Sequence, residues 1–562
     1  MFFTLGVSAI FPERCAELTG RALAADPSVM PVPGPAEVAW RSPDGRAALL
    51  RWGDAAEAGS GPAAETGTCA SRAGTIWAGA PEQRGGRVPL CARTSVTRVD
   101  PVYLAELPGA VVVADRATWA AWTSSRLDDH DALHLCALLN PGFPLGSVTP
   151  FTGVTAVAGS TALRVLDGSV TRVRDTAGPA AWAASPHASG GAADSRQAPR
   201  LEGARSVAEG LIAAVAPLRE AGSPVDLSLT GGKDSRLVAA ALVKAGVPVV
   251  ARTHGFDDHP DVVVAAEIAR RLGIEHVVRT PAAPGQQVDV LGRIRATVLV
   301  ADGMLSAFEN VGRPDPAASP ALTAGGHGGE LLRGGYAETA GRRGPAGGLR
   351  RALAPARDAA RSAELLRRLT TKHLGLIRRG PAAAYAASLT PWTARLARHP
   401  MHALDDFYLV NRAGRWSAAA RQAYLLRERL VQPLFDDRVV LTARAVPLSD
   451  RVSGALSAAV LAELSPALAD VPLAGKPPAG AGSPFDWRRQ YGDAITTFLR
   501  GYVLDLGATS ALFDVVSRPA AEKLLTPPHA DRALVWALAT AACLVSGDYR
   551  KARETTPQLP VA

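Results

Sequence analysis

One segment of the chain carries residue types that suit phosphate binding: Leu-Thr-Gly-Gly-Lys-Asp-Ser at 229–235. Two adjacent glycines allow a tight turn and a close approach of the backbone to a ligand. Asp234 and Ser235 suit the first turn of a helix, where free N–H groups and the helix dipole favour an anion. The segment is not a Walker A loop, because Lys233 is followed by Asp234 rather than by Ser or Thr. We predict a phosphate-binding turn; the alternative is an ordinary glycine turn between a strand and a helix.

The flanking sequence predicts the elements that would position this turn. Residues 225–229 and 247–253 are apolar runs typical of buried strands, whereas 235–245 and 260–272 are typical of helices. The second helix has apolar positions at Val263, Ala266, Ile268 and Ala269. The order strand, helix, strand, helix favours an α/β fold with a parallel sheet flanked by helices.

The first third of the chain has a different pattern. Apolar runs at 111–114 and 162–166, bounded by turn residues, indicate a strand-rich α+β domain. A stretch rich in small residues, Pro and Gly follows, and this composition indicates a linker. We therefore expect a first domain at 1–182, a linker at 183–203 and a second domain at 204–562.

The C-terminal part reads as mostly helical from about residue 350, with Pro/Gly loops at 380–391 and 471–485. The best candidate for a membrane helix, Ala533 to Val545, is shorter than the ~18 apolar residues that a span requires. The N-terminus lacks the basic residues of a signal peptide. Five scattered cysteines without a CxxC pair suit reduced core thiols. We expect a cytoplasmic protein without a membrane span.

The net charge of +9 has a local origin. Residues 342–379 contain eleven Lys or Arg and two Asp or Glu, an excess equal to that of the whole chain. Leucines at helical spacing in this segment predict helices with a solvated basic face. A docking surface for an acidic peptide or a partner protein is the alternative. Nucleic-acid binding is not expected, because no aromatic-interleaved basic motif or zinc finger accompanies the charge.

The segment 229–235 resembles the Ser-Gly-Gly-x-Asp-Ser pyrophosphate loop of the asparagine synthetase-like ATP pyrophosphatases. A second block at 326–336, Gly-His-Gly-Gly-Glu-Leu-Leu-Arg-Gly-Gly-Tyr, aligns without gaps with the family's Gly-Glu-Gly-Ala-Asp-Glu-Leu-Phe-Gly-Gly-Tyr. Weaker similarities lie at 265–276 and 432–436. The resemblance implies a parallel-sheet ATP-pyrophosphatase domain with a helical C-terminal part.

Residues 1–180 resemble, more loosely, the family's N-terminal glutamine amidotransferase domain, through 113–116 and 157–160. Phe2 stands where glutamine-using members have their nucleophilic cysteine. The resemblance therefore implies an amidotransferase-like (Ntn-type) domain that lacks its nucleophile and does not hydrolyse glutamine. The attacking amine would belong to a substrate, as in β-lactam synthetases and lasso-peptide cyclases. Lys-Asp-Ser-Arg at 233–236 looks most like the lasso-peptide cyclases.

The resemblance also implies roles for individual residues. Asp234 and Glu330 would bind Mg²⁺ together with the phosphates. His327 can titrate near pH 7 and is the candidate base or transition-state donor, with a structural histidine in a Gly-rich turn as the alternative. Lys476 is a candidate for neutralising an adenylate. The implied nucleotide site consists of Leu229, Thr230, Gly231, Gly232, Lys233, Asp234, Ser235, His254 and Gly326.

The expected reaction is ATP-dependent macrolactam formation in a lasso peptide. An Asp or Glu side chain of a precursor peptide would attack ATP to give an acyl-adenylate, and the peptide's N-terminal amine would then displace AMP. A leader-binding protein and a leader peptidase are the expected partners. The alternatives are a β-lactam synthetase, another small-molecule amide synthetase, or an ATP-binding scaffold without catalysis.

Overall fold

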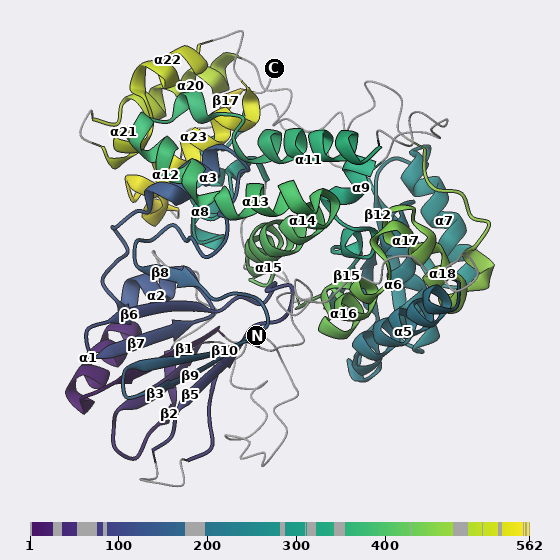
Figure 1. The fold of residues 1–562 in the computed structure, drawn as a ribbon, viewed down its shortest axis with the longest axis horizontal. Helices are drawn as coiled ribbons and strands as arrows, with labels where there is room; N and C mark the ends of the chain where they lie inside the picture. The colour runs from purple at the N-terminus through teal and green to yellow at the C-terminus, as the bar shows by residue number, and fades with distance from the viewer. Residues whose placement is uncertain are drawn as a thin grey trace.

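The computed structural model of the chain has three groups of elements (Figure 1). Two antiparallel sheets lie at the lower left of the view, a parallel sheet with its helices lies at the right, and further helices lie at the upper left and centre. The structure describes residues 3–25, 36–52, 76–81, 87–174, 197–280, 287–309, 311, 322–341, 354–426, 429–475, 493–507, 510–526, 531–552, 554, 556 and 559–560.

The N-terminal part is a sandwich of two antiparallel sheets. One has the strand order β2-β3-β1-β7-β6-β8 and the other β10-β9-β5-β4. The strands are β1 (Phe3–Ala9), β2 (Ala36–Arg41), β3 (Ala47–Trp52), β4 (Ile76–Ala78), β5 (Leu90–Arg93), β6 (Tyr103–Leu107), β7 (Ala110–Ala114), β8 (Val154–Ala156), β9 (Thr161–Leu166) and β10 (Ser169–Arg174). The predicted strands at 111–114 and 162–166 are confirmed as β7 and β9.

Strand β7 contributes to two cores because successive side chains point to opposite faces of a sheet. Val111 and Val113 pack between the two sheets, together with Leu163 of β9. Val112 belongs to the core on the opposite face. The helices α1 (Pro12–Leu23) and α2 (Ala117–Thr123) cover that opposite face.

The second part contains a five-stranded parallel sheet of order β13-β12-β11-β15-β16. Its strands are β11 (Val225–Ser228), β12 (Val249–His254), β13 (Glu275–Arg279), β15 (Leu322–Gly325) and β16 (Arg429–Val431). Helix α6 (Lys233–Lys244) joins β11 to β12, and α7 (Pro260–Leu272) joins β12 to β13. The predicted strand-helix-strand-helix unit is thus confirmed.

Two predicted core positions of α7 are wrong. Val263 is 55% exposed and Ala266 is also exposed, whereas Val262 and Ala265 are buried. The buried residues of α7 are Val262, Ala265, Ile268 and Ala269, which recur at the spacing of one helix face. The first half of the helix therefore faces the core through residues one position earlier than those predicted.

The strand order reverses beside β11. From β11 the chain continues to β12 and β13 on one side, whereas β15 and β16 lie on the other side. Connections that leave neighbouring strands in opposite directions open a crevice at the carboxyl ends of those strands, and ligands of open α/β sheets bind there. Segments 229–232 and 326–328 follow β11 and β15, so both glycine-rich blocks lie at this reversal.

Helix α5 (Gln197–Val215) begins inside the segment predicted as a linker, 183–203, so the linker prediction fails for 197–203. The helix packs against α6, α16 (Asp437–Ala445) and α18 (Ala455–Leu464). Ala204, Val207 and Leu211 supply the buried stripe that holds it there. Residues 183–196 lie outside the described part of the chain.

The predicted helical C-terminal part is present, but the loop predicted at 380–391 is wrong. Pro391 lies in the first turn of α13, where the missing N–H of proline has no intrahelical acceptor to lose. Residues 471–475 form no helix or strand, and 476–485 lie outside the described residues. The helices are α8 (Val290–Val300), α11 (Ala354–Thr370), α12 (Arg379–Ser388), α13 (Thr390–Arg398), α14 (Pro400–Phe407), α15 (Ala418–Tyr424), α17 (Leu448–Val452), α20 (Asp493–Leu504), α21 (Ala511–Val515), α22 (Arg518–Leu524) and α23 (Arg532–Val545).

The predicted first domain, 1–182, does not pack as a separate unit. Its helix α3 (Ala132–Leu139) lies among the C-terminal helices, against α12, α21 and α23 (Figure 1). Arg116 of the same segment forms a fully buried ion pair with Asp302. The sequence pattern thus changes near residue 182, but one hydrophobic core contains residues from both sides of this boundary.

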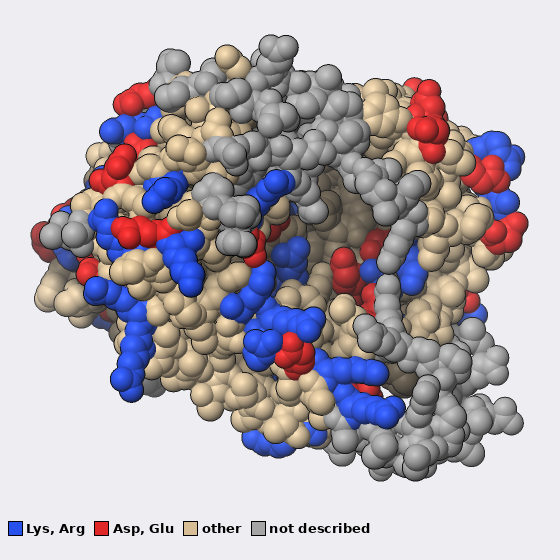
Figure 2. All heavy atoms as spheres, turned by 90° about the horizontal axis from the view of Figure 1, so that it is seen from above, with Lys and Arg blue, Asp and Glu red and all other residues tan. Residues whose placement is uncertain are grey.

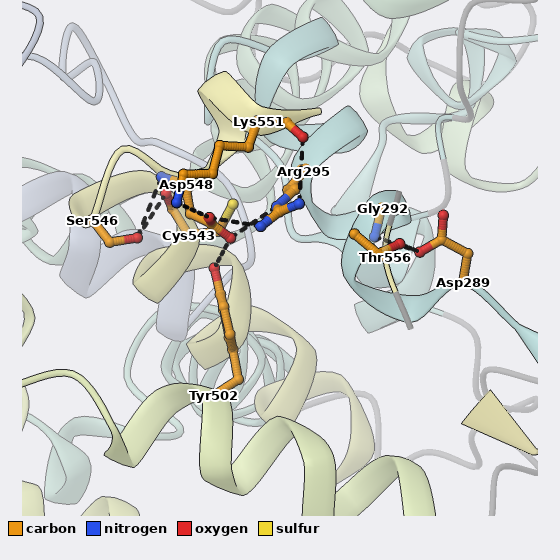
Figure 3. A network of polar contacts seen from close by, with 9 residues as sticks. All are labelled: Asp289, Gly292, Arg295, Tyr502, Cys543, Ser546, Asp548, Lys551 and Thr556. Atoms are coloured by element: carbon orange, nitrogen blue, oxygen red, sulfur yellow. Dashed lines mark hydrogen bonds and ion pairs between the residues drawn. The ribbon is translucent and has the colours of Figure 1, made fainter. Parts of the chain in front are cut away.

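A polar network fixes the C-terminal helices to one another (Figure 3). Asp548 accepts hydrogen bonds from Arg295 Nε at 2.9 Å, from Arg295 Nη2 at 2.8 Å and from the Tyr502 hydroxyl at 2.9 Å. Arg295 lies on α8 and Tyr502 on α20. Burial raises the pKa of Asp548, but the hydrogen bonds from Arg295 and Tyr502 outweigh it, and the net shift is downward.

The basic segment is helical where the structure describes it. On α11, Leu366 is buried and the arginines are exposed, namely Arg357, Arg361, Arg367 and Arg368. This confirms a helix with a solvated basic face over 354–370, whereas 342–353 lie outside the described residues. Figure 2, which views the molecule from above, shows a hollow with Lys and Arg side chains and some Asp and Glu side chains beside it.

Two further predictions concern thiols and membranes. Cys15, Cys136 and Cys543 are buried and Cys91 is half-buried, and none of these four cysteines forms a disulfide. Cys69 lies outside the described residues. Among the helices that the structure describes, none is long and apolar enough to cross a membrane.

Candidate functional site

The turn after β11 is held by hydrogen bonds between its own residues. The Thr230 amide donates to Ser235 Oγ at 3.1 Å, and the two hydroxyls lie 3.0 Å apart. The Gly232 amide donates to Thr230 Oγ1 at 3.2 Å, and the Gly231 amide donates to Asp261 Oδ1 at 3.0 Å. These contacts fix the turn in front of α6. The N-cap of α6 is Gly232, which has no side chain to accept from the amides of the first turn, so those amides remain for a ligand.

Arg236 determines which way the peptide groups of the turn face. Its side chain is buried and donates to Gly232 O at 2.9 Å from Nε and to Gly231 O at 3.0 Å from Nη2. In a trans peptide the C=O and the N–H point in opposite directions. Because both carbonyls face Arg236, the amides of Gly232 and Lys233 face away from it. The Gly232 amide already donates to Thr230 Oγ1, so Arg236 leaves the Lys233 amide at the outer side of the turn, where an anion would bind.

The same guanidinium ties a distant segment to the turn. Arg236 Nη1 donates to Val471 O at 2.9 Å, Nη2 donates to Pro472 O at 3.1 Å, and the Ala474 amide donates to Gly231 O at 3.1 Å. The segment 471–474 thus runs along the glycine turn. The predicted Lys476 lies outside the described residues, two positions beyond Ala474.

The glycine block after β15 packs directly on the start of α6. A Cβ on Gly326 would lie 2.5 Å from the Ser235 amide nitrogen, and a Cβ on Gly329 would overlap the Asp234 carboxylate. Any larger residue at either position would separate the two blocks. The structure therefore brings together Thr230, Gly231, Gly232, Lys233, Asp234, Ser235 and Gly326 in one site.

A charged cluster surrounds Asp234. Arg333 forms an ion pair with Asp234, and its Nε lies 3.0 Å from Glu338 Oε2. Lys233 Nζ lies 3.8 Å from the other oxygen of Glu338. Burial raises the pKa of Asp234; Arg333 opposes this shift, whereas Glu330 and Glu338 add to it, and the net shift is upward. The three carboxylates outnumber the two basic groups, so the cluster favours an additional cation.

Glu330 lies at the edge of this cluster, in the short helix η5 (Gly329–Arg333). It is half-buried, and its charge contributes to the raised pKa of Asp234. Burial raises the pKa of Tyr408, and Glu330 raises it further through its charge and a hydrogen bond. Glu330 is thus a carboxylate close to both Asp234 and Tyr408.

The donor set fits a Mg²⁺ ion that is shared with phosphates. Among the described residues no group of three or more His, Cys, Asp or Glu could hold a metal ion by itself. Mg²⁺ is commonly bound through one or two carboxylates together with substrate phosphates. Asp234 and Glu330 provide such a pair beside the uncapped start of α6.

The two candidate histidines lie at the same edge of the sheet. His254 is the last residue of β12 and is exposed. His327 is also exposed, and a Cβ on Gly325 would lie 3.3 Å from its Nδ1. Both side chains therefore lie at carboxyl ends of strands. Leu229 differs from them: it is a core residue whose amide donates to Arg252 O at 2.9 Å and whose carbonyl accepts from Thr253 Oγ1 at 2.8 Å.

Sequence reasoning missed four residues of the site: Asp261, Arg236, Arg333 and Glu338. Arg236 and Arg333 lie inside the two glycine-rich blocks, so their charge next to a phosphate-binding motif was an available signal. Asp261 and Glu338 carry no such signal, because their roles depend on contacts with Gly231 and Arg333.

Comparison with known proteins adds no family to this picture: no family model matches the chain, and no curated protein matches its sequence. The function therefore has to be inferred from the chemistry of the site itself.

Proposed function

We propose that the chain is an ATP-dependent amide-forming enzyme that closes the macrolactam ring of a lasso peptide. The observation that carries the proposal is the meeting of the turn 229–235 with the block 326–333 at the strand reversal between β11 and β15. An uncapped helix start, a buried arginine that orients amides and a pair of carboxylates suit a magnesium-bound triphosphate.

The reaction would consist of two displacements. A carboxylate of the peptide attacks the α-phosphorus of ATP, so that the α–β phosphoanhydride bond breaks and pyrophosphate leaves. The N-terminal amine of the peptide then attacks the acyl carbon, AMP leaves, and the amine loses a proton. Asp234 and Glu330 would hold a Mg²⁺ ion, and this ion would supply charge neutralisation for the leaving pyrophosphate.

The residues of the chain would orient the reactants and move the proton. The Lys233 amide that Arg236 orients would hold a phosphate oxygen, and the Lys233 side chain would add a positive charge beside it. His327 is exposed at the end of the neighbouring strand, and it is our candidate to accept the proton of the attacking amine. The hollow in Figure 2 has Lys and Arg as well as Asp and Glu side chains beside it, and we expect the basic ones to attract the acidic residue of the peptide. A leader-binding protein and a leader peptidase in the cytoplasm would deliver this peptide.

The test combines purified protein with MgATP and a leader-free peptide that has a free amine and an acidic side chain. We expect AMP formation and a peptide lighter by one water, both lost in Asp234→Asn. The matched control is Asp470→Asn, because Asp470 is an exposed aspartate next to the segment 471–474. AMP formed with a free β-amino acid but not with peptides would assign the chain to the small-molecule synthetases. Absence of ATP–pyrophosphate exchange with both substrates would indicate that the chain is an ATP-binding scaffold without catalysis.

A further inference from the structure

One face of the parallel sheet is apolar and covered, whereas the other is polar and partly open. Leu227 and Ala251 are paired in register and buried on the first face, where α6 and α7 pack. On the second face Ser228, at the end of the central strand β11, and His254, at the end of β12, are exposed. Parallel sheets are ordinarily covered on both faces, so the exposed end of the central strand indicates a space over the second face.

The open face carries surplus positive charge. Arg252 of β12 is paired in register with Ser228, and Arg279 of β13 is paired with His254, so all four residues lie on this face. Arg252 Nε lies 2.8 Å and Arg279 Nη2 lies 3.6 Å from the same oxygen, Asp226 Oδ2. Within the described part of the chain, Asp226 is the only carboxylate at ion-pair distance from either guanidinium. Two positive groups thus share one negative group.

Both arginine side chains are accessible to a ligand. The side chain of Arg252 is 28% exposed and that of Arg279 is 48% exposed. A guanidinium has five N–H donors, so one carboxylate oxygen does not exhaust the donors of either arginine. A second carboxylate can therefore reach this pair from solvent and form charge-assisted hydrogen bonds with it.

The imidazole of His327 lies over the same face. Gly325 of β15 is paired in register with Ser228, so a Cβ on Gly325 would point to the open face. This Cβ would lie 3.3 Å from His327 Nδ1 and 3.8 Å from His327 Cε1, and it would meet no other described residue within 4 Å besides its chain neighbours. The strands of Arg252 and Gly325 flank β11 on its two sides. The space above Ser228 therefore has Arg252 on one side and His327 on the other.

We propose that the space above Ser228 binds the carboxylate of the peptide's acidic side chain before adenylation, with Arg252 as its charge partner. This inference rests on the proposed function and adds a substrate subsite to it. The carboxylate has to approach a triphosphate of the same sign of charge, and a guanidinium beside it offsets that repulsion. In this position the carboxylate lies next to the glycine turn that follows Ser228, and the amine that attacks its acyl carbon lies beside His327.

The triphosphate is the other anion that the surplus positive charge could attract. Its proposed site is at the start of α6, and α6 packs on the apolar face of the sheet. Arg252 points to the opposite face, together with Ser228. We therefore assign Arg252 to the carboxylate, and a role toward ATP is an outcome of the test.

Binding of two capped amino acids tests the subsite without any reaction. N-acetylglutamate N-methylamide presents a side-chain carboxylate as its only charge, and N-acetylglutamine N-methylamide is its neutral counterpart. Saturation-transfer NMR measures both dissociation constants. We expect Arg252→Met to raise the Kd of the glutamate probe about tenfold and to leave that of the glutamine probe unchanged, a selective loss that a structural role alone would not give. Arg252→Lys should recover part of the affinity. The matched control is Arg518→Met, which removes a half-buried, ion-paired arginine of α22 and should bind both probes like the unchanged protein.

ATP–pyrophosphate exchange with the leader-free acidic peptide separates the subsite from the proposed function. We expect Arg252→Met to raise the KM for the peptide about tenfold and to leave the KM for ATP unchanged. Exchange with an unchanged KM for the peptide would support the enzyme and overturn the subsite, and so would a rise in the KM for ATP alone. Arg252-dependent binding of the glutamate probe without any exchange would support the carboxylate site and overturn the proposed function. Equal affinity of the unchanged protein for the two probes, or no binding of either, would overturn the subsite.

Discussion

The Arg295–Asp548 network and the Asp234–Arg333 cluster both pair a guanidinium with a carboxylate, but they balance charge differently. Asp548 receives hydrogen bonds from Arg295 and Tyr502, and its pKa is lowered. The pKa of Asp234 is raised although Arg333 is its partner. The first group is electrostatically complete within the protein. The second contains surplus negative charge, which is what a site for a cation and its phosphates needs.

The two regions also differ in what they connect. Asp548 connects α8 and α20 through Arg295 and Tyr502, and so stabilises the packing of these helices (Figure 3). Asp234 and Arg333 join two turns at a sheet edge where the fold leaves a crevice. The saturated ion pair therefore fits a structural role, whereas the unsaturated one is what the proposed nucleotide site requires.

Arg295→Met should have the largest effect on stability. It leaves the partly buried Asp548 without its guanidinium, which costs about 3–5 kcal/mol in comparable pairs. Denaturant unfolding measures this loss. The KM for ATP should stay unchanged because the network lies outside the proposed nucleotide site; a parallel rise in KM would show that the two regions are coupled.

Asp234→Asn should give the opposite result. We expect AMP formation to fall by about 100-fold or more, since an electrostatic contact to the reacting phosphates is removed. Stability should change little, because burial already disfavours the charged form of Asp234. AMP release and denaturant unfolding are measured on the same preparation, and a large loss of stability would give Asp234 a structural role like that of Asp548.

His327→Ala should separate the two chemical steps. Loss of a general base slows proton transfer by about 100-fold, so ring closure should slow while ATP–pyrophosphate exchange continues. The measurement is the ratio of cyclised peptide to exchange rate. Equal loss of both activities would indicate that His327 only shapes the Gly-rich turn.

Arg236→Lys should act mainly on nucleotide binding. A lysine ammonium cannot reproduce the fork that reaches Gly231 O, Gly232 O and Val471 O. If the misoriented amides weaken the binding free energy of ATP by about 1.4 kcal/mol, the KM for ATP would rise about tenfold. Steady-state kinetics should show this rise with a smaller change in kcat; an unchanged KM would mean that the turn amides do not contact ATP.

The smallest effect should appear in the pH dependence of stability, where the two aspartates have opposite signs. The lowered pKa of Asp548 contributes stability above the ordinary Asp pKa of about 3.9, and this is lost as the pH falls further. The raised pKa of Asp234 makes the folded state relatively more stable as the pH falls toward that pKa. In Asp548→Asn the free energy of unfolding should fall less at acid pH than in the unchanged protein. In Asp234→Asn the relative gain in the free energy of unfolding with falling pH should be absent.

The local pattern of apolar and turn residues was sufficient to predict the strands and helices that position the site. The strands at 225–229 and 247–253 and the helix at 260–272 follow from apolar runs and turn residues that act over a few neighbours. The adjacent glycines at 231–232 predicted a tight turn between a strand and a helix, and the turn lies between β11 and α6. Such predictions succeed because they depend on residues that are adjacent in sequence.

Only the tertiary structure decided which charges meet. Arg333 reaches Asp234 across 99 positions and Arg236 reaches Val471 across 235 positions, and no periodicity reports such pairs. The placement of α3 among the C-terminal helices and the helical state of 380–391 likewise depend on packing against distant segments. The sequence by itself determined the strands, the helices and the glycine turns of the site, because these depend on local conformational preference. Tertiary structure decided the electrostatic balance, because buried charges depend on the whole fold around them.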